Sequence, residues 1–238
     1  MRPFTPPDRI RYTAQILNVR EVAIYGTADR DCWQTWLQPL GLQPATTTDA
    51  AHVIINATAL VWQGLRFREL IVTVATTTGA DLTQADSFYL AYACNSSPIL
   101  AWAERALFQT PYLHREVAVD TTAPRMEVRH CGQSALRAQL GQPRAPTAPV
   151  METWAGPVFL PVSRPRHQRG GSYFMVAISG EQAVYPFAPD VNILTLPPAG
   201  DHLAFAWLRD SHFTPTEWRI RANATHARSQ TYRRGTIE

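Results

Sequence analysis

A glutamate stands at the start of an apolar, strand-like run, in residues 66–71 (RFRELI). If its side chain faces inward, burial raises the pKa of the carboxyl group and suits Glu69 to general base chemistry. If the side chain faces water instead, Glu69 is a strand-end carboxylate paired with Arg66 or Arg68. The residues alone leave both interpretations open.

Lysine is absent from all 238 positions, and the 22 basic residues are all arginines. The absence reflects either a compositional drift toward arginine or a functional constraint. In both cases no side-chain amine is present to form a Schiff base with a carbonyl substrate or to act as a lysine general base. The sequence therefore excludes one kind of covalent catalysis.

Other catalytic and metal-binding patterns are missing. There is no G-x-S-x-G motif, no P-loop and no G-x-G-x-x-G after a strand. The cysteines Cys32, Cys94 and Cys131 are widely spaced and form no C-x-x-C pair. His130 lies beside Cys131, but adjacent residues of an extended strand point to opposite faces. We therefore expect no metal site and no cofactor.

The net charge of +3 is unevenly distributed. One basic cluster holds Arg164, Arg166, His167 and Arg169, and a second holds Arg219, Arg221, Arg228, Arg233 and Arg234. Such runs are usually solvated loops and tails, and the alternative is a binding site for phosphate, RNA or an acidic partner. We expect no nucleic-acid partner, because no RNA motif with interleaved aromatic residues accompanies them.

The N-terminal residues resemble no secretory signal, and no apolar run approaches the roughly 18 residues of a membrane span. We therefore expect a cytoplasmic protein with reduced thiols and no membrane span.

Strand signals dominate the chain, because many short runs are rich in Val, Ile, Thr and aromatic residues. These runs are 20–25, 52–60, 67–77, 87–93, 116–120, 125–130, 173–178 and 217–224. Two segments, 29–40 and 96–108, predict helices, and 198–209 predicts a third, weaker one. In the second helix Ile99, Trp102, Ala103, Ala106 and Leu107 form an apolar stripe. Glu104 and Arg105 lie on the other side, where we expect structural helix charges.

These elements predict a mainly β, α+β fold: a largely antiparallel barrel or strongly bent sheet with two or three peripheral helices. We expect a single domain over residues 1–238. Residues 139–149 are proline-rich and form a crossing loop or a linker between halves, and 226–238 form a basic C-terminal tail.

A set of spaced residues between Val19 and Asp120 resembles a known family. These are Val19-Arg20-Glu21, Asp29-x-x-x-Trp33-x-x-x-Leu37-x-Pro39-Leu40-Gly41-Leu42, Phe67-Arg68-Glu69-Leu70, Phe88-Tyr89-Leu90-Ala91-Tyr92 and Ser96-Ser97-Pro98-x-x-x-Trp102-x-x-Arg105-x-x-Phe108-x-x-Pro111-Tyr112. In order and spacing they resemble the acetoacetate decarboxylase-like superfamily, and its uncharacterised branch in particular. The resemblance covers the first half of the chain well and the second half loosely.

The resemblance implies a cone-shaped barrel with a small internal cavity. In the decarboxylases that cavity holds a lysine, within Pro-Lys-Lys after a short helix, that forms a Schiff base with a β-keto acid. The matching residues here are Pro111-Tyr112-Leu113. A phenol makes no imine but donates a hydrogen bond or acts as a general acid, with an ordinary pKa of about 10. The alternative for Tyr112 is a core aromatic residue with a hydrogen-bonded hydroxyl group.

Two further family positions match, and one does not. Arg20 matches an arginine at the cavity mouth that would hold a substrate carboxylate, and the alternative is a surface ion pair with Glu21 or Asp29. Glu69 matches a cavity glutamate. A second family glutamate falls where Asn56 is the polar candidate for substrate binding.

Two functional hypotheses follow. In the first, the barrel binds a small carboxylate- or carbonyl-bearing ligand through Arg20, Asn56, Glu69 and Tyr112. Whether the chain is an enzyme stays open; if it is, we expect lyase- or hydratase-type chemistry on an oxo-acid with Glu69 as base and Tyr112 as acid. In the second, a non-catalytic protein docks onto a larger assembly through Arg164, Arg166 and Arg169 or the C-terminal arginines.

Overall fold

The computed structural model describes residues 9–47, 49–77, 81–141, 146–161, 171–196 and 203–233. The helices in these ranges are α1 (Arg30–Leu37), α2 (Pro98–Leu107) and α3 (Leu203–Asp210), with a 3-10 turn, η1 (Gln38–Leu40), directly after α1. The strands are β1 (Tyr12–Asp29), β2 (Gln43–Pro44), β3 (Thr46–Thr47), β4 (Ala50–Trp62), β5 (Leu65–Thr77), β6 (Ser87–Asn95), β7 (Tyr112–His114), β8 (Glu116–Asp120), β9 (Arg125–His130), β10 (Gln133–Gln139), β11 (Val150–Leu160), β12 (Ser172–Pro186), β13 (Ile193–Thr195) and β14 (Thr214–Arg233). The predicted mainly β fold with a few helices is confirmed.

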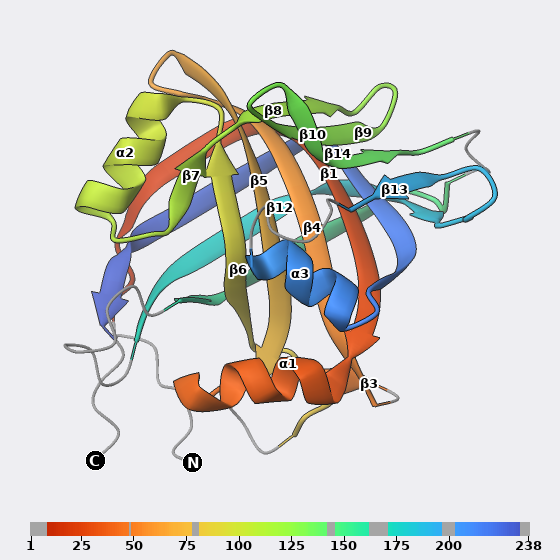
Figure 1. The fold of residues 1–238 in the computed structure, drawn as a ribbon. Helices are drawn as coiled ribbons and strands as arrows, with labels where there is room; N and C mark the ends of the chain where they lie inside the picture. Colours follow the sequence, from red (N-terminus) through yellow and green to blue (C-terminus); the bar gives the residue numbers. More distant parts are fainter. Residues whose placement is uncertain are drawn as a thin grey trace.

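Seven strands close into a ring (Figure 1). Ten strands form one sheet in the order β2-β5-β4-β1-β14-β12-β11-β6-β7, with β3 paired to β4. Strands β5 and β6, which lie near opposite ends of this order, also pair with each other, and this pairing closes the ring. All pairs are antiparallel except those of β6 with β11 and with β7. The ring is not an even barrel, because register shifts interrupt the long strands β1, β12 and β14.

A second sheet and two helices cover the outer face of the ring. The second sheet has the order β13-β10-β9-β8. In Figure 1 its strands β8, β9 and β10 lie at the top and β13 lies at the right, α1 crosses the bottom and α3 lies in front of β4 and β5. The main hydrophobic core joins these layers and includes the fully buried Trp33 of α1 and Trp218 of β14. This core fixes the outer face of the strands and thereby directs the alternate side chains inward.

The predicted helices form where the sequence places their caps. The carboxylate of Asp29 accepts a hydrogen bond from the Cys32 amide at 3.0 Å, and Gly41 follows the η1 turn with a left-handed φ of 64°. The Ser97 hydroxyl accepts from the Leu100 amide at 3.4 Å at the start of α2. The third helix starts at Leu203, and the residues before it in the predicted segment lie outside the described ranges.

The prediction of a basic C-terminal tail over 226–238 is wrong for residues 226–233, which belong to β14. His226 pairs with Ile16 of β1 on one side and with Ile178 of β12 on the other. The reason is that β14 is a central strand of the ring, so both of its edges are hydrogen-bonded. Residues 234–238 lie outside the described ranges, as do residues 142–145 of the proline-rich segment.

Candidate functional site

Four polar residues form a row across neighbouring strands on one face of the ring. Glu21 of β1 is opposite Thr58 of β4, Thr58 is opposite Glu69 of β5, and Glu69 is opposite Asn95 of β6. Directly opposed residues point to the same face of a sheet. Tyr112 of β7 shares this face, because its partner Ala93 is two residues from Asn95.

This face is the inside of the ring. Arg228 of β14 lies close enough to Glu69 of β5 and Tyr112 of β7 to change the pKa values of both groups, although these strands are not neighbours in the sheet. Side chains from distant strands meet in this way only when they point toward the middle of a closed sheet. The polar row therefore faces the interior.

Glu69 is the central group of the site. Its Oε1 accepts a hydrogen bond from Asn95 Nδ2 at 2.9 Å, and the Tyr112 hydroxyl lies 3.5 Å from Oε2. Burial, and after it the negative charge of Glu104, raises the pKa of Glu69 to about 8. The Glu69 carboxyl group thus bonds to interior partners rather than to Arg66 or Arg68, which are exposed.

Tyr112 supplies a phenol that stays protonated. The residue is buried, and burial, followed by the charge of Glu69, raises the pKa of its hydroxyl well above 10. Its backbone carbonyl accepts a hydrogen bond from Nη1 of Arg105 at 2.8 Å, which ties β7 to α2. At neutral pH the Tyr112 hydroxyl is therefore a hydrogen-bond donor beside the Glu69 carboxyl group.

The helix α2 is turned the opposite way to our prediction. Glu104, which we expected to be a structural helix charge, faces the interior, where it accepts hydrogen bonds from Nη1 of Arg228 and from the Thr110 hydroxyl. Ile99 and Trp102 of the predicted apolar stripe are instead exposed, at 69% and 58%. The physical reason is that α2 packs over a polar part of the ring, so its charged side has a partner inside.

Arg228 presents an unused pair of donors, a feature that our sequence analysis missed. Its guanidinium plane lies over the Phe174 ring, 4.2 Å from the centroid, and its Nη1 is bound by Glu104. Among the residues that the structure describes, Nε and Nη2 of Arg228 are buried and have no hydrogen-bond partner. These two N–H groups form one edge of the guanidinium fork, the edge that binds a carboxylate bidentately.

The expected role of Arg20 at the cavity mouth does not fit its position. Arg20 is exposed and pairs with Ala59, one residue out of step with Glu21 and Thr58, so its side chain points to the outer face. There its charge contributes to lowering the pKa of Asp120, after the backbone hydrogen bonds to that carboxylate. Strand alternation is the reason: Glu21 occupies the inner position and Arg20 the outer one.

Asn56 lies on the inner face, as the prediction requires. It is opposite Ile71 on β5 and is thus a diagonal neighbour of Glu69. Its Oδ1 is buried and has no hydrogen-bond partner within the described residues. The interior therefore holds an unused acceptor as well as unused donors.

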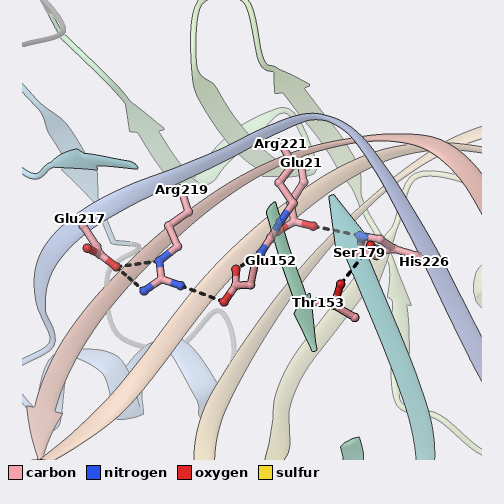
Figure 2. A network of polar contacts seen from close by, with 8 residues as sticks. All are labelled: Glu21, Glu152, Thr153, Ser179, Glu217, Arg219, Arg221 and His226. Carbon is pink, nitrogen blue, oxygen red and sulfur yellow. Dashed lines mark hydrogen bonds and ion pairs between the residues drawn. The ribbon is translucent and has the colours of Figure 1, made fainter. Parts of the chain in front are cut away.

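A second polar cluster continues the inner face beyond Glu21 (Figure 2). The Glu21 carboxylate pairs with Arg221, and its Oε2 lies 2.9 Å from Nε2 of His226. Arg221 also pairs with Glu152, and Arg219 lies 3.6 Å from the same Glu152. Burial alone would raise the pKa of Glu21, but the hydrogen bond and charge of His226 and the charge of Arg221 together hold it below its ordinary value.

Three of the arginines that we expected on a basic docking surface point into the ring instead. Arg219, Arg221 and Arg228 were expected on a basic surface, but each is paired with a glutamate on the inner face of the ring. Arg164, Arg166 and Arg169 lie outside the described residues. In the described ranges no three His, Cys, Asp or Glu side chains gather into a potential metal site, and none of the helices there is long and apolar enough to cross a membrane.

The fold is similar to that of the acetoacetate decarboxylase-like enzymes, so the resemblance seen in the sequence holds for the architecture. No family model and no curated protein matches the sequence. Among solved structures, the enduracididine biosynthesis enzyme MppR complexed with pyruvate superimposes with a TM-score of 0.61 at 13% identity, over 99% of this chain and 93% of MppR. The acetoacetate decarboxylase of Legionella pneumophila gives 0.58 at 13%, over 97% and 90% of the two chains. An acetoacetate decarboxylase-like enzyme from Sphingomonas wittichii RW1 gives 0.54 at 11%, over 92% and 93%.

Proposed function

We propose that this protein binds a small 2-oxo acid inside the ring and catalyses proton transfer at the carbon next to the carbonyl group, without a Schiff base. The observation that carries the proposal is the arrangement around Glu69. A carboxyl group with a pKa of about 8 lies beside a protonated phenol and within electrostatic reach of a guanidinium group that has a free edge. Acid–base catalysis uses groups whose pKa values lie near the working pH.

Each group has one role. The free edge of Arg228 holds the substrate carboxylate, so Arg228 replaces Arg20 as the anion clamp. Tyr112 donates a hydrogen bond to the ketone oxygen. Ionised Glu69 removes a proton from the adjacent carbon; the C–H electrons form an enolate whose negative charge rests on the oxygen held by Tyr112. Return of the proton from Glu69 restores the keto acid.

The enolate is the common intermediate of lyase- and hydratase-type reactions of oxo acids, so this step is the core of the chemistry we expected from the sequence. Asn56 would accept a hydrogen bond from a further group of the substrate through its unused Oδ1. The absence of lysine supports a route without an imine. That MppR was solved with pyruvate supports the choice of a small 2-oxo acid.

The test follows deuterium entering the methyl group of pyruvate in heavy water by proton NMR. We expect the protein to accelerate the exchange, and Glu69→Gln to reduce the acceleration by at least about 100-fold, because the amide is not a base. Glu116→Gln, which changes an exposed glutamate of β8, is the matched control and should exchange pyruvate as the unmodified protein does. Equal rates for Glu69→Gln and Glu116→Gln would rule out Glu69 as the base.

A further inference from the structure

A hydrophobic cluster lies inside the ring, beside the polar groups around Glu69. Its buried members include Leu90, Tyr112, Val158 and Phe174, and Phe88 and Trp154 pack against them. Tyr112 is also the phenol beside Glu69, and the guanidinium group of Arg228 lies over the Phe174 ring. The cluster therefore begins at two of the groups that we assign to substrate binding and extends away from them along the inner face.

The register of the strands places Trp154 and Phe88 on this inner face. Glu152, which pairs with Arg221 inside the ring, is two residues before Trp154 on β11, so both side chains point inward. Val158, four residues after Trp154, is opposite Phe88 of β6. The two aromatic rings meet edge to face, with their centroids 4.8 Å apart. We call these two side chains the Trp154–Phe88 wall.

The Trp154–Phe88 wall is only partly covered by other side chains. Both of its residues keep part of their surface exposed to water, although they point into a closed ring. The same is true of Ile71, which shares the inner face with Glu69 two residues before it on β5. A tightly packed interior would bury these side chains completely. Apolar surface that is left in water inside the ring gains stability when an apolar group of a ligand covers it.

Gly156 determines where the indole of Trp154 lies. A Cβ atom at Gly156 would come within 2.5 Å of Cζ2 of Trp154 and within 3.1 Å of the Asp86 carbonyl oxygen. The indole therefore occupies the space that a side chain at position 156 would fill. Because this position has no side chain, the indole lies along β11 and reaches the Phe88 ring.

We propose that the 2-oxo acid carries an aromatic group on carbon 3 and that Trp154 and Phe88 bind this group. The inference rests on the proposed function, because Arg228 and Tyr112 hold the carboxylate and the ketone oxygen at one end of the hydrophobic cluster. The group on carbon 3 then follows the cluster toward the Trp154–Phe88 wall.

Two features of the wall define the kind of group that it binds. Aromatic rings pack favourably against other aromatic rings in edge-to-face or offset-stacked arrangements, which an aliphatic chain does not reproduce. Beyond Trp154 the inner face becomes charged, because Glu152 is paired there with Arg221. The apolar stretch therefore suits a single ring close to carbon 3 rather than a long chain or a tail with its own charge.

The test is a calorimetric titration of the unmodified protein and of Trp154→Ala with phenylpyruvate and with pyruvate. We expect the unmodified protein to bind phenylpyruvate at least about tenfold more tightly than pyruvate, because the phenyl group is transferred from water to an apolar surface. Trp154→Ala should lower this ratio of dissociation constants by at least about fivefold, because half of the wall is removed. Trp102→Ala is the matched control, because Trp102 is exposed on α2 and lies outside the cluster; it should keep the full ratio.

Gly156→Ala is a second variant that displaces the indole without removing it, and it decides the question if circular dichroism shows that Trp154→Ala does not fold. This variant should also weaken the binding of phenylpyruvate more than that of pyruvate. Equal affinities of the unmodified protein for the two acids would overturn the inference, as would a ratio that the wall variants leave unchanged. Tighter binding of 2-oxoglutarate than of phenylpyruvate would also overturn it and would assign this part of the interior to the charged groups around Arg221.

The titrations distinguish a failure of this inference from a failure of the proposed chemistry. Catalysed exchange of pyruvate without any preference for phenylpyruvate would overturn only the role of the Trp154–Phe88 wall. A preference for phenylpyruvate that depends on Trp154, without catalysed deuterium exchange of either acid, would support the wall and overturn the role of Glu69 as a base. Absence of binding of both acids would overturn both proposals.

Discussion

Arg228 and Glu104 are 124 residues apart in the chain, yet Nη1 of Arg228 donates hydrogen bonds to both carboxylate oxygens of Glu104. This pair joins the last strand of the ring to α2 and lies beside Glu69. It occupies Nη1 of the guanidinium group, and within the described part of the chain Nε and Nη2 have no hydrogen-bond partner. The pair therefore sets both the position of a candidate anion site and the charge that Glu69 experiences.

The first prediction concerns Glu104. Glu104→Gln should lower the pKa of Glu69 below about 8, because the charge of Glu104 is the largest contribution to that raised pKa after burial. The pH at which pyruvate exchange reaches half its maximum should fall accordingly. We also expect a loss of about 1–3 kcal/mol in the free energy of unfolding, because Arg228 loses its ionised partner. A half-maximum that stays in place would show that the two carboxyl groups do not interact.

The second prediction concerns the pH dependence of the unmodified protein. Glu69 is protonated below its pKa of about 8 and becomes a base above it, so the exchange rate at pyruvate concentrations well below KM should rise with pH and level off above 8. Binding of pyruvate should weaken over the same range, because ionised Glu69 repels the substrate carboxylate. Calorimetric titration of Glu69→Gln with pyruvate should lack this weakening.

The same raised pKa links Glu69 to stability. A carboxyl group whose folded pKa exceeds its unfolded value stabilises the protein fully below the unfolded pKa, and this contribution is lost as the pH rises through the folded pKa. Between pH 5 and 9 the free energy of unfolding should therefore fall less in Glu69→Gln than in the unmodified protein. The difference should exceed about 1.4 kcal/mol, the equivalent of one pKa unit. Urea unfolding at several pH values measures it, and parallel curves would contradict the raised pKa of Glu69.

The third prediction concerns Tyr112. Tyr112→Phe should reduce the exchange rate by about 100-fold at saturating substrate, because the enolate oxygen loses its donor. The KM should change little, since the carboxylate contact with Arg228 remains. The free energy of unfolding should change by less than about 1 kcal/mol, because the hydroxyl makes only a long hydrogen bond of 3.5 Å to Glu69. A large loss of stability with an unchanged rate would make Tyr112 a structural core residue.

The fourth prediction concerns the second polar cluster. Glu21→Gln should lower the free energy of unfolding by about 3–5 kcal/mol, because it leaves the buried Arg221 without one of its two carboxylate partners. The exposed Glu181 offers the control: Glu181→Gln should unfold at the same urea concentration as the unmodified protein.

Because the pKa of Glu21 is lowered, the fall in the free energy of unfolding at acidic pH tests the contacts of this carboxylate. A carboxylate whose pKa is lower in the folded state contributes stability above its unfolded pKa. This contribution is lost as the pH falls through the folded pKa. The unmodified protein should therefore lose stability on acidification more steeply than Glu21→Gln. Equal slopes would show that the carboxylate gains nothing from His226 and Arg221.

Local patterns predicted much of the fold. The Asp29 and Ser97 caps and the β-branched runs place α1, α2 and most strands correctly, because capping and strand propensity depend on nearby residues. They did not predict that residues 226–233 continue a strand, since the pairing of β14 with β1 and β12 joins segments from opposite ends of the chain.

Orientation was the weaker part of the prediction. The apolar stripe of α2 was expected to pack inward, but the partner of Glu104 is Arg228, which no local pattern brings near. Arg20 was expected in the site, yet a strand places it outside and Glu21 inside. A shift of one residue reverses the face of a strand, and only the register of the whole ring decides between the two.

By itself the sequence determined that the chain is rich in strands, where its helices begin, and that no lysine is present for imine chemistry. Tertiary structure alone decided which charged groups meet. Closure of the ring brought Glu69, Tyr112, Glu104 and Arg228 together from four separate elements. The physical reason is that hydrogen-bonding and capping preferences act between neighbours in the chain, whereas the pKa of a buried carboxyl group depends on every charge around it in space.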